Sequence, residues 1–131
     1  MIFSYQKSQR GQSMPLLMTR ASRNNKFFTE YALVDSGAGL NVLPHRLGVE
    51  LGLDWDALNR GPNLSGNADG ETKLVELLVK ISDFDELPLL FAWSIHDRVR
   101  FILGQDDFFK HFHVCFFGDR NVFSVSKIEQ A

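Results

Sequence analysis

A short acidic turn holds the residues of this chain that are best suited to chemistry. Two apolar residues lead directly into Asp35, and Ser36, Gly37 and Ala38 follow it. This pattern predicts a carboxylate at the end of a buried strand, where glycine turns the backbone and lets another group approach it closely. A carboxylate held in this way can exchange protons with a substrate. On its own, however, Asp-Ser-Gly is also a common surface turn.

Two later segments bear on the interpretation of this turn. Ile102 and Leu103 run into Gly104, a pattern typical of a second buried strand that ends at a glycine. Between the two motifs lies a glycine-rich segment, residues 66–70. Together these segments favour a functional interpretation of Asp35 over a plain turn.

The three segments resemble those of the retropepsin-like aspartic proteases, the half-size relatives of pepsin that include the retroviral proteases. The resemblance spans residues 14–126. It implies an aspartic endopeptidase that needs no cofactor, with Asp35, Ser36 and Gly37 as catalytic residues. It also implies a hairpin, the flap, at residues 65–73, which closes over a bound polypeptide. The substrate-binding positions that it implies are Ala38, Gly39, Gly66, Asn67, Ala68, Asp69, Gly70, Ile102, Leu103 and Gly104.

The presence of one acidic motif per chain has a consequence for assembly. Hydrolysis by paired carboxyl groups needs one as base and one as acid, and two carboxyl groups in one site hold a proton between them. The acidic residues at 83–86 and 106–107 lack a following glycine and a similar apolar run. We therefore expect a homodimer with Asp35 of each subunit in one site. The chain ends, Ile2–Tyr5 and Val122–Lys127, are expected to add strands across that interface.

Two positions depart from the family pattern. Retroviral members usually carry an acid after the alanine and an arginine after the second glycine, whereas this chain has Gly39 and Gln105. In the family, this acid and this arginine pair with each other and support the dimer. Because both are replaced here, no charge loses its partner. The changes predict a weaker dimer. They also leave open an alternative function, a non-catalytic dimerisation or peptide-binding module on the same fold. The next residue, Asp106, is expected to cap a helix.

Length and composition indicate one ordinary globular domain. We expect a polar N-terminal arm at residues 1–13 and a single domain at residues 14–131. The net charge is −2, from 14 Lys and Arg against 16 Asp and Glu, which gives no electrostatic reason to expect nucleic-acid binding. No run approaches the ~20 apolar residues that a membrane helix needs, so we expect a cytoplasmic protein with no membrane segment in this chain.

The single cysteine and its neighbours offer other kinds of site. Cys115 cannot form a disulfide within the chain, and its apolar flanks predict a buried, unreactive thiol. With His111 and His113 it would form a zinc site if all three lay on one strand face. Because the run begins in an expected helix, we expect no metal. Residues 65–76 have the spacing of a calcium loop, but serine stands at its first position.

The elements that must position these residues are mostly strands. Strands are expected at residues 14–20, 27–34, 87–95, 101–103, 114–117 and 122–125. Pro44 and Gly52 bracket one short helix, and residues 106–112 predict a second. Residues 64–82 fit both a helical stripe and strict alternation, of which we favour the strand. The fold class predicted is therefore all-β, a small, partly closed β-barrel with one or two short helices.

Overall fold

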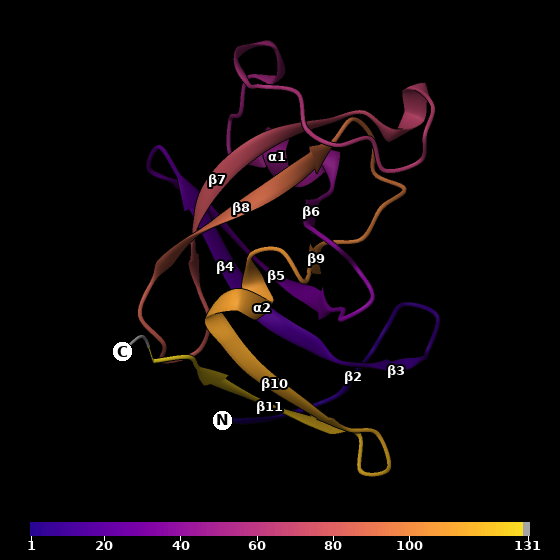
Figure 1. The fold of residues 1–131 in the computed structure, drawn as a ribbon, viewed down its shortest axis with the longest axis vertical. Helices are drawn as coiled ribbons and strands as arrows, with labels where there is room; N and C mark the ends of the chain where they lie inside the picture. The colour runs from indigo at the N-terminus through magenta and orange to yellow at the C-terminus, as the bar shows by residue number, and fades with distance from the viewer. Residues whose placement is uncertain (130–131) are drawn as a thin grey trace.

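Strands make up most of the regular secondary structure in Figure 1, a computed structural model that describes residues 1–129. The strands are β1 (Ile2–Ser4), β2 (Gln6–Lys7), β3 (Ser13–Met14), β4 (Leu16–Arg23), β5 (Lys26–Val34), β6 (Asn41–Leu43), β7 (Thr72–Lys80), β8 (Leu87–Ser94), β9 (Ile102–Leu103), β10 (Phe112–Phe117) and β11 (Val122–Lys127). The helices are α1 (His45–Glu50) and α2 (Phe108–His111), with the 3-10 turns η1 (Trp55–Ala57) and η2 (Ala68–Gly70).

Six strands form a closed barrel in the order β4-β5-β9-β6-β8-β7. The expected hairpin is β4 and β5, joined by Asn24 and Asn25 with φ angles of 53° and 67°. Asparagine tolerates this left-handed region better than most residues, which suits a two-residue turn. The barrel closes fully because β7 pairs with both β4 and β8. The predicted all-β barrel is confirmed, and it is closed rather than partly closed.

Of the ambiguous segment at residues 64–82, residues 72–80 form a strand, as alternating burial shows, whereas residues 64–71 form a loop that contains η2. In β7, Val75, Leu77 and Val79 are at most 2% exposed, whereas Glu76 and Leu78 between them are exposed. This two-residue period places one face of β7 in the core and the other in water. Large aromatic side chains fill the same core, and those that are fully buried include Phe91, Trp93, Phe108, Phe112 and Phe123.

Both predicted helices are present and short. Pro44 precedes α1, and Gly52 follows it with φ of 71°, as expected for a helix stop. The second helix, α2, has only four residues. The prediction that Asp106 caps it is wrong, since the N-cap is Asp107 and no side chain caps the helix. The carboxylate of Asp106 lies instead 3.2 Å from the ammonium group of Lys110. In the part of the chain that is described, no helix is long and apolar enough to cross a membrane.

The chain ends form a second, three-stranded sheet in the order β1-β11-β10 (Figure 1). Residues 1–13, expected as an arm, thus contain β1, which pairs with β11 of the same chain, and β2, which pairs with β3. Strand addition across a dimer interface stays a prediction. The expectation of a buried Cys115 is wrong, because this thiol is exposed on β10.

Candidate active site

Asp35 lies directly after β5, where the strand leaves the barrel wall. Its backbone N–H donates to the carbonyl oxygen of Leu103 at 3.0 Å, which extends the pairing of β5 with β9 by one residue. The side chain is half-buried, and its Oδ1 atom accepts a hydrogen bond from the N–H of Gly37 at 2.9 Å. The turn closes with the N–H of Ala38 donating to the carbonyl oxygen of Asp35 at 3.2 Å. The carboxylate is therefore fixed in place while it remains accessible.

Gly37 is small because the carboxylate lies over it. A Cβ atom at this position would come within 3.2 Å of Oδ1 of Asp35, so a larger residue would crowd the hydrogen bond. Ser36 and Gly37 are both exposed, and Gly39 beyond them is exposed with open space around it. The turn thus presents backbone and carboxylate together on an open surface. A second copy of the turn, or a substrate, could contact them there.

Gly104 lets a second loop cross behind the Asp35 turn at very short range. A Cβ atom on Gly104 would lie 2.3 Å from the carbonyl oxygen of Leu40 and 2.8 Å from that of Ala38. Beyond the glycine, the N–H of Gln105 donates to Ala38 at 2.9 Å, and that of Asp106 donates to Gly39 at 2.8 Å. The two loops therefore support each other through backbone hydrogen bonds. Their contact fixes the position of the carboxylate.

Asn41 is a site residue that the sequence analysis missed. Its side chain is completely buried, where its Oδ1 accepts from the N–H of Gly104 at 2.8 Å and its Nδ2 donates to the carbonyl oxygen of Leu90 at 3.0 Å. A buried amide needs such partners to offset its loss of water. The only signal in the sequence is one asparagine inside an otherwise apolar run, Leu40–Leu43.

Gln105 stands where the retroviral proteases, which the motifs resemble, usually carry arginine. Its Nε2 donates to the carbonyl oxygen of Ser36 at 2.7 Å, so it ties the second loop to the Asp35 turn from outside. The residue is exposed, so water competes for this bond. A neutral amide thus holds the two loops together without an acid at Gly39.

The segment expected as a flap is an irregular hairpin. Gly61 donates to the carbonyl oxygen of Thr72 at 3.0 Å, and Leu64 donates to that of Gly70 at 2.9 Å, which folds residues 60–72 back on themselves. The tip is the 3-10 turn η2 and not a regular β-turn. Four of the five expected substrate-binding residues here are exposed, and the exception is Gly70. An ion pair of 3.4 Å joins Asp69 to Arg98, in the segment before β9.

The expected site residues thus divide into two groups. The structure brings residues 35–39 together with Leu103 and Gly104, while residues 66–70 contact their own loop and Arg98. Leu103 is completely buried, so its side chain supports the turn and cannot face a substrate. Ile102, beside it, is half-buried.

The two histidines near the C-terminus, His111 and His113, lie on different elements of the structure. Nε2 of His111 lies 3.2 Å from Oδ1 of Asp107, within α2 and its cap, and His113 is exposed on β10 with Cys115. In residues 1–129, no group of three or more His, Cys, Asp or Glu side chains is arranged to hold a metal.

Purified protein is accordingly expected to hold no stoichiometric zinc. The imidazole of His111 already has a carboxylate partner on its own helix, which leaves His113 and Cys115 as an incomplete set of ligands. Elemental analysis of protein prepared without chelators tests this. One zinc per chain that disappears in His113→Ala would contradict it, whereas His96→Ala is the matched control outside the cluster.

Comparison with known proteins supports the fold. No model of a known protein family and no curated protein matches this sequence. Among solved structures, a retropepsin-like aspartic protease from Rickettsia conorii has a TM-score of 0.64 and 19% sequence identity. The match covers 96% of this chain and 94% of that chain. The fold is therefore retropepsin-like, which confirms the fold that the motifs at Asp35 and Gly104 indicate.

Proposed function

We propose that this chain is an aspartic endopeptidase that acts as a homodimer on polypeptide substrates. The observation that carries the proposal is the Asp35 turn, where a half-buried carboxylate is held by the N–H of Gly37 at 2.9 Å. The turn lies at the crossing of two loops in a retropepsin-like fold. The aspartic protease activity of the structural neighbour supports the same reaction for this chain.

The proposed reaction uses one carboxyl group from each subunit. Two carboxyl groups in contact cannot both ionise, so they share one proton. The ionised Asp35 takes a proton from a water molecule while the water oxygen attacks the scissile carbonyl carbon. The protonated Asp35 of the second subunit donates its proton as the peptide C–N bond breaks. The two groups end with one proton between them, and no cofactor takes part.

The remaining site residues hold this pair and the substrate. Ser36 is exposed beside the carboxylate and would brace the two turns across the interface. Gly37 exposes its backbone to the substrate, and residues 65–73 would cover the bound peptide and reduce access of water.

Cleavage is expected to be faster at acidic pH. One carboxyl of the pair must keep its proton to act as the acid, so activity falls as the pH rises and that proton is lost. The test incubates the protein with a peptide mixture from pH 3 to pH 8 and identifies the products by mass spectrometry. Binding of peptides without any cleavage across this range would favour the non-catalytic module instead.

Specific activity is expected to rise with protein concentration. Each chain supplies one Asp35, so a monomer lacks either the acid or the base. The replacement of an ion pair by Gly39 and Gln105 predicts a dimer that dissociates at low concentration. Sedimentation over a dilution series, run beside the activity assay, measures both quantities. A monomer with full activity per chain would contradict the shared site.

A further inference from the structure

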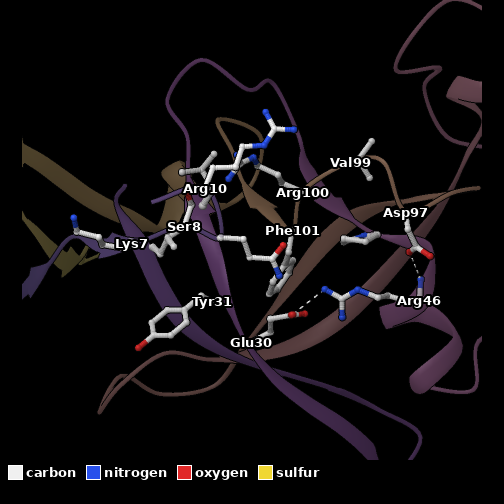
Figure 2. A pocket seen from close by; sticks show the side chains of 14 residues that line it. Lys7, Ser8, Arg10, Glu30, Tyr31, Arg46, Asp97, Val99, Arg100 and Phe101 are labelled. Carbon is white, nitrogen blue, oxygen red and sulfur yellow. Dashed lines mark hydrogen bonds and ion pairs between the residues drawn. The ribbon is translucent and has the colours of Figure 1, made fainter. Parts of the chain in front are cut away.

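A cavity of about 410 Å³ lies beside the strand that leads to Asp35. Figure 2 shows that it gathers side chains from the N-terminal segment, from β5, from the start of α1 and from the segment before β9. Leu33 lines it, two residues before Asp35. Two residues of extended chain span about 7 Å, so the cavity begins within reach of anything bound at the Asp35 turn.

The charges around this cavity are unequal. Four basic side chains line it, and two carboxylates. One oxygen of each carboxylate is already engaged by a single residue, Arg46. Its Nη2 lies 2.8 Å from Oε1 of Glu30, and its backbone N–H donates to Oδ1 of Asp97 at 2.7 Å (Figure 2). The hydrogen bond with Glu30 is the main cause that raises the pKa of Arg46, so this guanidinium stays charged.

The other three cations carry the excess charge. Within residues 1–129, neither Lys7, Arg10 nor Arg100 lies within 4.0 Å of a carboxylate oxygen. All three are exposed, and Figure 2 draws Arg10 and Arg100 on one side of the cavity with Glu30 and Arg46 on the other. Hydrogen bonds from Ser8 to Gln12 and from Gly11 to Ser8 fold the loop that presents Arg10.

The cavity also has an apolar part, which narrows the class of ligand. Phe101 is buried, and Leu16 and Leu33 are half-buried. The planar guanidinium group can donate two parallel hydrogen bonds to a carboxylate. The apolar surface suits an apolar side chain that neighbours this carboxylate in the sequence of the ligand. An acidic and partly apolar polypeptide offers both features, whereas a free inorganic anion offers only the charge.

We propose that this basic pocket, lined by Lys7, Arg10 and Arg100, selects substrates with acidic side chains two to four residues from the scissile bond. The selection rests on the proposed protease function. An extended peptide that lies over the Asp35 turn covers about 7–13 Å in that number of residues. Its carboxylates then contact the three cations, and its apolar side chains contact Leu16 and Phe101.

The test measures binding apart from cleavage. The probe is a fluorescent ten-residue peptide of alternating glutamate and leucine, compared with the same peptide carrying glutamine for glutamate. With Asp35→Asn protein, the acidic peptide is expected to bind at least about tenfold more tightly at low salt. The double variant Arg10→Gln/Arg100→Gln removes this preference. Arg20→Gln/Lys26→Gln, which removes equal charge at the far end of the β4–β5 hairpin, keeps it.

Three results of the binding test would overturn the inference. They are equal binding of the two peptides, an equal loss of binding in both double variants, and displacement by inorganic phosphate as readily as by unlabelled acidic peptide. Cleavage by the parent protein separates this inference from the proposed function. Hydrolysis without an acidic preference leaves the protease and removes the pocket's role. Selective binding without hydrolysis leaves the pocket and removes the protease.

Discussion

Asparagine in place of Asp35 is expected to abolish peptide hydrolysis and to leave the fold intact. The amide keeps an oxygen that can accept from the N–H of Gly37, a bond of 2.9 Å in the structure, so the turn retains its geometry. Between pH 3 and pH 8, the amide can neither take a proton from water nor release one to the leaving nitrogen. Because a homodimer loses both carboxyl groups at once, we expect kcat/KM to fall by at least about 1,000-fold.

A fluorogenic peptide cleaved by the parent protein measures this loss, and circular dichroism and thermal unfolding report on the fold. Asp83→Asn is the matched control, because it makes the same change of atoms and charge at an exposed residue in the β7–β8 turn, away from the site. It should keep the parent activity within about twofold, as surface substitutions usually do. Equal cleavage by parent and Asp35→Asn protein would exclude the proposed chemistry.

Local sequence patterns predicted the elements well where burial follows the period of the chain. The alternation from Val75 to Ile81 identified β7 because that strand has one face in the core and one in water. Pro44 and Gly52 identified α1 because both act through the backbone alone. The motifs at Asp35 and Gly104 indicated the fold for a similar reason. Each motif consists of a strand, the point at which the strand ends, and a position that requires a small residue.

Predictions about single side chains failed where a distant part of the chain decides the environment. Cys115 has apolar neighbours in sequence, yet it is exposed because β10 buries Phe112 on one face and holds Cys115 on the other. Asp106 stands where a cap is expected, but the backbone turns one residue later, at Asp107 with φ of 129°. The backbone N–H of Asp106 donates to the carbonyl oxygen of Gly39. The local sequence pattern predicts neither the exposure of Cys115 nor the position of the N-cap of α2.

The site itself shows the same division. Sequence reasoning found the carboxylate and both glycines of the crossing loops, because each has a local requirement. It missed Asn41 on β6, whose amide joins Gly104, just after β9, to Leu90 on β8, the two strands that flank β6. The partners of that amide lie 63 and 49 residues away in sequence. It also missed the basic pocket, because Arg10, Arg46 and Arg100 are neighbours only after folding.

Alanine in place of Gly104 is expected to destabilise the protein and to damage the site together. Its Cβ atom would lie 2.3 Å from one backbone carbonyl oxygen and 2.8 Å from another, and a backbone cannot rotate away as a long side chain can. The crossing loops must separate, which weakens the hydrogen bonds from the N–H of Gln105 to the carbonyl oxygen of Ala38 and from the N–H of Gly104 to Oδ1 of Asn41. We expect a loss of about 2–4 kcal/mol in the free energy of unfolding.

Gly39→Ala is the matched control, since the same methyl group is added on the same crossing, where no atom lies within 4 Å. It should change the free energy of unfolding by no more than about 0.5 kcal/mol. Urea unfolding of both variants measures the difference, and the cleavage assay shows whether the site follows. If the two variants are equally stable, the loops do not cross as closely as the structure indicates. If Gly104→Ala is unstable but fully active at low temperature, the crossing holds the fold and not the carboxylate.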